Sequence, residues 1–374
     1  MTRRHATDIV PSQETYLLTD ITPPKNAPLF GFWYPACTSQ ELRPGKLKGT
    51  VLLGLPILVC KTSIGEVAAM RDLCPHRGMP LSFGRMRGDC IECAYHGWRF
   101  DHKGRCRDIP ALVQGSQIQT DKIGVNTYPC LERDGYVWVF IPDPLQPHQS
   151  IPDIPSLPLP TSRYRMIQIS KVLNCAADDG IIGLIDPLHG PFVHQNFWWR
   201  TQASMHEKAK AFEPLPAGFR MTSHAPSQNS VPYKILNLFY GSTPTTTIDF
   251  LLPNQRFELV ECGKVFVSMR AMVTPVTDQQ CRMDFCAAWN ALAWLPFSKI
   301  LFRYFGNIFL EQDKQAMERQ ALGLRYKPPL MLLDDADLPT KWYFKLKAAH
   351  LASVQTGQPL EHPLKSRVTL RWTS

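Results

Sequence analysis

Two cysteine-histidine pairs between residues 74 and 96 constrain the fold more than any other feature. One residue separates Cys74 from His76, two residues separate Cys93 from His96, and sixteen residues lie between the pairs. Two loops that each supply one thiolate and one imidazole can hold a compact metal centre only if the chain brings them side by side. The sequence therefore predicts a domain organised around two facing loops.

The ligand mixture favours an iron-sulfur cluster over zinc. Structural zinc sites usually have two to four residues between paired ligands, which the gap between Cys74 and His76 does not satisfy. In a Rieske centre, two cysteines bind one iron of a two-iron cluster and two histidines bind the other. We predict a [2Fe-2S] cluster held by Cys74, His76, Cys93 and His96, with a zinc-binding module as the alternative. Cys90 falls outside the spacing and is interpreted as a packing residue.

The pattern along the chain predicts two domains of an α+β protein. Short apolar runs broken by glycine and proline predict an all-β domain over residues 28–147, after an N-terminal extension of residues 1–27. A proline-rich stretch, residues 148–162, is typical of a linker. Strand-like and helical patterns over residues 163–374 predict a sheet with helices, including a helix over residues 307–324.

Composition narrows the function classes. The chain has 374 residues, 20% of them charged, and a formal net charge of +9. Its lysines and arginines are dispersed, with no basic run interleaved with aromatic residues, so nucleic acid is not an expected partner. The most apolar stretch, residues 285–310, is interrupted by Pro296, Lys299, Arg303 and Asn307, so we expect no transmembrane segment. The N-terminus lacks the apolar core of a secretory signal, which predicts a cytoplasmic protein.

Several motifs resemble the oxygenase (alpha) subunits of the Rieske non-haem iron oxygenases. The matching stretches are FWYPA at 32–36, CPHRG at 74–78, CAYHGWRF at 93–100 and DPLHGPFVH at 186–194. The resemblance covers most of the chain. It implies that residues 28–147 form the Rieske domain and that residues 163–374 form a catalytic domain of helix-grip type, with an antiparallel sheet flanked by helices.

The resemblance also implies a mononuclear iron(II) site. The family motif Asp-x-x-His-x4-His places His189 and His194 as ligands, and the acidic run EQDKQAMERQ places Asp313 as the third. Glu311 and Glu318 are the alternatives, as ordinary charges on a solvated helix face. Two histidines and one carboxylate make a facial triad that leaves positions open for dioxygen and substrate.

Asp186 has two interpretations. In the resembling family, the aspartate at this place bridges the iron ligand His189 and the cluster ligand of the next subunit in a homotrimer, which would be His96 here. We therefore expect Asp186 to be a catalytic residue and the protein to be a trimer. The alternative is a helix N-cap, because Asp followed by Pro187 is a common helix start.

One departure concerns the residues before Asp186. Family members commonly carry a Glu-Asn pair there, whereas this chain has Ile182 and Gly183, with Asn174 and the pair Asp178-Asp179 further upstream. The hydrogen bonds around the iron ligands are therefore expected to be rearranged.

The resemblance implies an oxygenase that takes electrons from a separate reductase or ferredoxin, and so indirectly from NAD(P)H, to oxidise a small apolar substrate with dioxygen. Monooxygenation, by hydroxylation or demethylation, is favoured over dioxygenation, and a Rieske electron-transfer protein is the alternative. The rings of Phe192, Phe197, Trp198 and Trp199 near the second histidine favour an aromatic substrate, unless they belong to the core.

The cluster segment is also basic. Residues 71–108 contain eight lysines and arginines against five acids. Such a surface would attract an acidic electron donor, although a solvated surface of mixed charge explains the same residues. The eight basic residues are Arg71, Arg77, Arg85, Arg87, Arg99, Lys103, Arg105 and Arg107.

Overall fold

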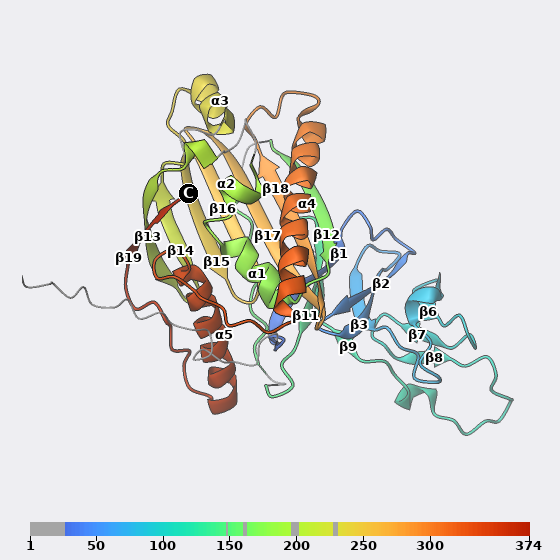
Figure 1. The fold of residues 1–374 in the computed structure, drawn as a ribbon. Coiled ribbons are helices and arrows are strands. Elements are labelled where there is room, and N and C mark those ends of the chain that lie inside the picture. The colour runs from blue at the N-terminus through green and yellow to red at the C-terminus, as the bar shows by residue number, and fades with distance from the viewer. Residues whose placement is uncertain (1–26, 147–148, 160–162, 196–201, 227–230) are drawn as a thin grey trace, which may run out of the picture.

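The computed structural model describes residues 27–146, 149–159, 163–195, 202–226 and 231–374. The expected N-terminal extension, residues 1–27, therefore lies outside the described residues except for Ala27. A group of small sheets forms the N-terminal part, and one large sheet crossed by helix α4 forms the rest (Figure 1).

Three antiparallel sheets make up the N-terminal domain. The first contains β1 (Phe32–Thr38), β11 (Tyr136–Ile141) and β10 (Cys130–Arg133). The second contains β2 (Leu47–Leu52), β3 (Leu55–Lys61), β4 (Val67–Arg71) and β9 (Thr127–Tyr128). The third contains β5 (Arg85–Arg87), β6 (Cys90–Glu92), β7 (Arg99–Asp101) and β8 (Cys106–Asp108). Two short 3₁₀ turns, η2 (Leu81–Phe83) and η3 (Thr120–Lys122), lie in the connections.

Strand β11 explains how the two domains are joined. All of its residues are buried, because successive side chains of a strand point to opposite faces and both faces are covered here. Val137 and Val139 pack into the core of the N-terminal domain. Tyr136, Trp138 and Phe140 pack into a second core that includes residues of the large sheet. The YVWVFI run therefore belongs to both domains.

The large sheet has eight antiparallel strands. Their order is β12 (Arg165–Leu173), β18 (Gln280–Trp289), β17 (Val265–Thr277), β16 (Gln255–Cys262), β15 (Thr245–Leu251), β14 (Gly218–His224), β13 (Glu207–Leu215) and β19 (Val368–Thr373). The helices are α1 (Ala177–Ile185), α2 (Gly190–Val193), α3 (Val231–Tyr240), α4 (Ser298–Leu324) and α5 (Leu338–Thr356), with a 3₁₀ turn η4 (Gln202–Ser204). This arrangement confirms the predicted fold class.

Helix α4 packs closely on the edge of the large sheet. It begins at Ser298, nine residues before the predicted start at Asn307. A side chain at Gly306 would have its Cβ 2.7 Å from Cδ1 of Ile169, so glycine allows this close approach to β12 without displacing the Ile169 side chain. One turn earlier, Phe302 stacks on Trp289 of β18, with ring centroids 4.1 Å apart. These contacts hold α4 across the sheet (Figure 1). None of the described helices is long and apolar enough to cross a membrane.

A buried arginine connects the large sheet to the N-terminal domain. Arg270 of β17 is 1% exposed and donates to Asp134, at 2.9 Å, and to the carbonyl of Pro155. Its guanidinium lies 5.3 Å from the ring centre of Trp138 and 4.9 Å from that of Phe257. Pro155 belongs to the proline-rich segment, and its neighbours Ile154 and Leu157 pack into the core that joins the two domains.

A buried ion pair fixes α1 to α5. The ammonium group of Lys347 donates to both oxygens of Asp178, at 2.7 and 2.8 Å, and the Tyr343 hydroxyl donates to the same carboxylate at 2.6 Å. All three residues are buried. Because α1 leads directly into the DPLHGPFVH segment, this pair supports the position of that segment.

We expect Lys347→Met to lower the free energy of unfolding by about 3 kcal/mol, because it leaves the Asp178 carboxylate buried without its cation. Urea unfolding, compared with the exposed-site control Lys345→Met, measures the effect. The control should stay within about 0.5 kcal/mol of the wild type. Equal unfolding curves for the two variants would show that the pair does not stabilise the fold.

Candidate metal centres

The two cysteine-histidine loops have the same backbone structure. In each loop the cysteine N–H donates to the carbonyl five residues later at 2.8 Å. Gly78 and Gly97 donate back to the carbonyls of Cys74 and Cys93, at 2.9 and 3.1 Å. Both glycines have a left-handed backbone, with φ of 70° and 71°, which glycine adopts without a steric penalty. The sequence therefore folds both loops into matching turns.

The four side chains of these loops face one another. Cys74 and Cys93 are buried, and the rings of His76 and His96 lie 4.5 Å apart. The ring of Trp98 stacks on that of His76, with the ring centroids 4.8 Å apart. Nδ1 of His76 is buried and makes no hydrogen bond within the described part of the chain. Burial raises the pKa of the Cys74 thiol to about 11, so a thiolate here needs a bound cation. The donor set fits the predicted cluster.

Cys93→Ala should abolish the visible absorption of a [2Fe-2S] cluster and the acid-labile sulfide, because the cluster requires both thiolates. Cys90 supplies the matched control. It lies half-buried on β6, three residues before Cys93, and faces Arg87 and Asp101 across the sheet. Cys90→Ala should keep the spectrum, and the reverse pattern in the two variants would transfer the ligand role to Cys90.

Three residues from two distant segments form a second group of metal-ligand atoms. His189 and His194 flank the short helix α2, and Asp313 lies in the middle of α4. One ligand atom from each residue lies within 4.8 Å of the other two. Nε2 of His194 is 3.0 Å, and Nε2 of His189 is 3.7 Å, from Oδ1 of Asp313. The structure thus brings together the three residues proposed as iron ligands.

Both histidines present Nε2 to Asp313 and turn Nδ1 toward an oxygen atom. Nδ1 of His194 lies 3.0 Å from Oε1 of Gln312, and Nδ1 of His189 lies 3.4 Å from Oδ2 of Asp186. An acceptor behind Nδ1 fixes the tautomer in which Nε2 is free to bind metal. Gln312 is close enough to hydrogen-bond His194 in this way, whereas Asp186 faces His189 at a distance that does not form a hydrogen bond. This donor arrangement fits a divalent iron. The sequence did not single out Gln312, although it directly precedes Asp313 in the acidic run.

Asp186 also shapes the local turn. It follows the last residue of α1, and its Oδ1 accepts from the backbone N–H of Leu188 at 2.7 Å. No helix begins at Pro187, since α2 starts at Gly190, so Asp186 is not the N-cap considered from the sequence. One carboxylate oxygen therefore stabilises the turn while the other faces His189, and the side chain is 30% exposed.

The other acidic residues considered as ligands have different partners. Glu311 forms an ion pair with Lys171 of β12 at 3.1 Å. Glu318 accepts from the backbone and side-chain nitrogens of Asn174, both at 2.9 Å. Both carboxylates are thus engaged away from the two histidines, which favours Asp313.

Gly183 explains one departure from the family pattern. A side chain there would have its Cβ 2.2 Å from Sδ of Met317, so any larger residue would require the Met317 side chain to move away from α1. Met317 is one turn after Asp313 on α4. The glycine therefore helps to bring the histidine segment to the carboxylate.

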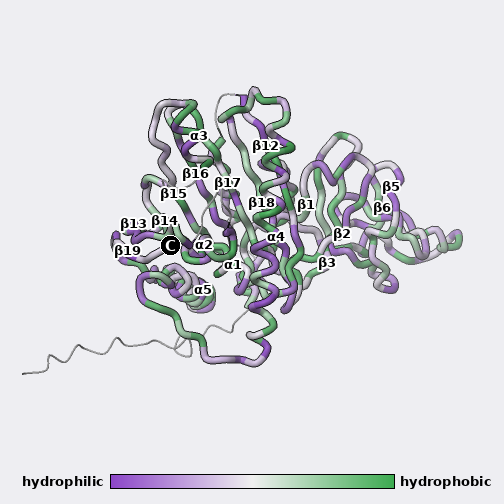
Figure 2. Tube along the Cα trace, turned by 45° about the horizontal axis from the view of Figure 1, so that its top comes forward, coloured by the Kyte–Doolittle hydropathy of each residue, from purple (hydrophilic) through white to green (hydrophobic). Residues whose placement is uncertain are grey.

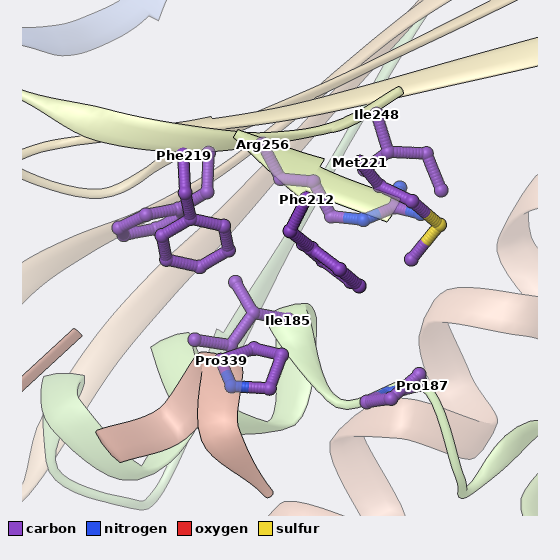
Figure 3. A pocket seen from close by; sticks show the side chains of 9 residues that line it. Ile185, Pro187, Phe212, Phe219, Met221, Ile248, Arg256 and Pro339 are labelled. Carbon is purple, nitrogen blue, oxygen red and sulfur yellow. The ribbon is translucent and has the colours of Figure 1, made fainter. Parts of the chain in front are cut away.

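An apolar cavity lies beside the start of the DPLHGPFVH segment, where Ile185 and Pro187 contribute to its lining. It has a volume of about 20 Å³, room for roughly one water molecule. Ile185 and Pro187 flank Asp186 on one wall, and Arg256 of β16 approaches from the sheet (Figure 3). The full lining is Ile185, Pro187, Phe212, Phe219, Met221, Ile248, Phe250, Arg256 and Pro339. Of the four rings considered from the sequence, Phe192 is exposed, whereas Phe197, Trp198 and Trp199 lie outside the described residues.

Ion pairs partly neutralise the basic surface near the cluster loops. Arg85, Arg87 and Arg99 pair with Glu92. Two further arginines, Arg105 and Arg107, pair with Asp101. Eight cations against five acids still leave an excess of three positive charges over residues 71–108.

Comparisons with known proteins identify the N-terminal domain and several relatives. The model of the Rieske [2Fe-2S] domain matches residues 32–129. Chlorophyllide a oxygenase of Chlamydomonas reinhardtii is 33% identical over 46% of this chain and 25% of its own length. The oxygenase component of dicamba O-demethylase from Stenotrophomonas maltophilia is 32% identical over 44% of this chain and 47% of its own length. The oxygenase subunit of 3-chlorobenzoate-3,4-dioxygenase from Comamonas testosteroni is 31% identical over 44% of this chain and 37% of its own length. The matched region thus spans less than half the length of each of these relatives.

Solved structures resemble the whole chain more fully. NdmA of Pseudomonas putida CBB5 with caffeine has a TM-score of 0.70 at 23% identity and covers 87% of this chain and 93% of its own. Dicamba monooxygenase bound to dicamba has a TM-score of 0.68 at 22% identity, and the match covers 86% of this chain and 98% of the dicamba monooxygenase chain. These likenesses establish a shared fold.

The matched domain and the shared fold define a class: a Rieske [2Fe-2S] domain followed by a second domain with the fold of the solved oxygenase structures. Two of the relatives are named as the oxygenase subunit or the oxygenase component of an enzyme, and this chain is similar to each of them over 44% of its length.

Proposed function

We propose that this chain is the oxygenase component of a Rieske non-haem iron oxygenase that oxidises a small apolar substrate, with residues 28–147 as the cluster domain and residues 163–374 as the catalytic domain. The convergence of His189, His194 and Asp313 carries the proposal, because a pure electron-transfer protein has no use for a second ligand set. The expected location is the cytoplasm.

When bound, the cluster supplies single electrons and the mononuclear iron activates dioxygen beside the substrate. The chain would hold the cluster with Cys74, His76, Cys93 and His96 and the iron with the triad. Asp186 and Gln312 would keep the two imidazoles oriented, each by accepting the proton on Nδ1.

Monooxygenation is the favoured reaction. A single catalytic chain of about this length often carries out hydroxylation or demethylation in this family. A demethylase and a dioxygenase are both among the relatives, so the reaction itself must be measured. The test supplies ¹⁸O₂ to the holoenzyme with a surrogate reductase, across a panel of aromatic, heterocyclic and terpenoid compounds. The expected outcome is either one labelled oxygen atom in a hydroxylated product or an unlabelled demethylated product with one equivalent of formaldehyde. Two labelled oxygen atoms in a diol would establish dioxygenation instead.

We also propose that an acidic ferredoxin or reductase docks beside the cluster loops. The excess of cations over residues 71–108 would steer such a donor, so cluster reduction should slow by about tenfold between low and physiological ionic strength. Stopped-flow reduction kinetics measure the rate. Lys103→Glu should slow reduction at low salt, whereas Lys365→Glu, on the exposed loop before β19, should not. Rates of cluster reduction that do not depend on ionic strength would contradict electrostatic docking.

A further inference from the structure

Helix α3 has an apolar face that no other described element covers. Val231, Ile235, Leu238 and Phe239 are exposed and are spaced so that they share one face of the helix. Leu238 is 80% exposed and Phe239 is 60% exposed. Burying such side chains in water-soluble proteins is favourable, so a whole face left open marks an interaction site.

A second apolar segment extends this face. Trp294 and Phe297, in the connection between β18 and α4, are each 72% exposed. Ile300, Leu301 and Tyr304 continue the exposed row along the first turns of α4. The opposite side of the same turns packs on the sheet through the contacts of Phe302 and Gly306 described above. The exposed row is therefore the outward face of a firmly held helix.

These two segments form one surface. The backbone N–H of Leu292 donates to the Tyr240 hydroxyl at 2.7 Å, which ties the end of α3 to the connection before α4. Both segments lie at the same end of the molecule in two views (Figures 1 and 2). We call the exposed side chains of residues 231–240 and 290–304 the apical surface.

Charge indicates what covers the apical surface. Lys234, Lys299 and Arg303 are exposed within it, and residues 231–240 and 290–304 contain no aspartate or glutamate. Lys299 and Arg303 lie one turn apart on α4, so they share one side of the helix. They border the exposed apolar side chains of Ile300, Leu301 and Tyr304. Exposed tryptophan, tyrosine and phenylalanine beside lysine and arginine are typical of residues at the interface between a bilayer and water.

We propose that the apical surface binds the interface of an anionic lipid bilayer. Its aromatic and aliphatic side chains would enter the headgroup region while the three cations meet lipid phosphates. The protein would thus lie on a membrane surface without crossing it. This attachment is independent of the reaction and of the metal ligands.

The test is sedimentation of the full-length holoprotein with vesicles of phosphatidylcholine and phosphatidylglycerol in equal parts, and with vesicles of phosphatidylcholine alone. The wild type should bind the anionic vesicles more tightly, and added salt should weaken that binding. Leu238→Ser with Trp294→Ser should lower the partition coefficient at least about tenfold, because each buried side chain of this size contributes about one such factor. Ile64→Ser with Val113→Ser removes equally exposed apolar residues of the N-terminal domain and should have no effect.

Charge reversal and oligomeric state complete the test. Lys299→Glu with Arg303→Glu should abolish the preference for anionic vesicles, whereas Lys345→Glu with Arg367→Glu should preserve it. Light scattering and the cluster spectrum establish that every variant keeps its assembly and fold. Absence of vesicle binding by the wild type, or equal binding by the apical and control variants, would overturn the proposal. A change of oligomeric state in the apical variants would assign the surface to a contact between subunits instead.

Discussion

Replacing Asp313 with alanine should remove the mononuclear iron and abolish dioxygen-dependent turnover, with the cluster spectrum unchanged. The carboxylate is the single anionic member of the triad, and its Oδ1 lies close to Nε2 of both histidines. Without it, two neutral imidazoles remain to hold a divalent ion that favours a two-histidine, one-carboxylate face. We expect turnover to fall by at least about a hundredfold, since changes even to groups behind metal ligands cost about 10- to 100-fold.

Glu311→Ala is the matched control for Asp313→Ala, because it removes a carboxylate from the same helix two residues away. Its ion pair with Lys171 is exposed in part and should contribute little, so iron content and turnover should stay near those of the wild type. Metal analysis and product formation measure both variants. Full iron occupancy in Asp313→Ala, together with iron loss in Glu311→Ala, would transfer the ligand role to Glu311.

Asp186→Asn should lower turnover by about 10- to 100-fold while both metal centres and the oligomer persist. The amide oxygen of asparagine can still accept from the N–H of Leu188, so the turn should form. Its NH₂ group, however, would face Nδ1 of His189, where the imidazole needs an acceptor. The substitution therefore separates the role in the turn from the proposed roles in orienting the histidine and passing electrons.

The same variant tests the proposed trimer. The cluster loops lie toward the outer end of the N-terminal domain, whereas α2 and α4 lie over the large sheet (Figure 1). We propose that electrons reach Asp186 from His96 of a neighbouring subunit in a homotrimer. In Asp186→Asn the cluster should then stay reduced after single-turnover mixing with dioxygen. Wild-type turnover in this variant, or an active monomer by light scattering, would contradict the route between subunits.

Local motifs predicted the candidate sites better than they predicted the helices. The two cysteine-histidine loops could be predicted from the sequence because their proposed ligands and glycines are close together in the chain. Such loops form with few contacts to distant residues. His189 and His194 could be predicted as a pair for the same reason, since they lie in one short segment. Asp313 depended on the resemblance, because a carboxylate in an acidic helix carries no local sign that it faces His189 across more than a hundred residues.

Several elements could not be predicted because tertiary packing decides them. The start of α4 at Ser298 follows a proline and an apolar run, and it becomes helical where Phe302 and Gly306 meet the sheet. The approach of α1 to α4 at Gly183 likewise appears only when both helices are in place.

The most direct test of the central claim is the content of iron and acid-labile sulfide in the anaerobically purified protein, with the Asp313→Ala variant measured beside it. We expect about three irons and two sulfides per chain in the wild type, and a loss of about one iron with no loss of sulfide in the variant. A protein with two irons and two sulfides, unchanged by Asp313→Ala, would be an electron carrier. Zinc without sulfide would contradict the account altogether.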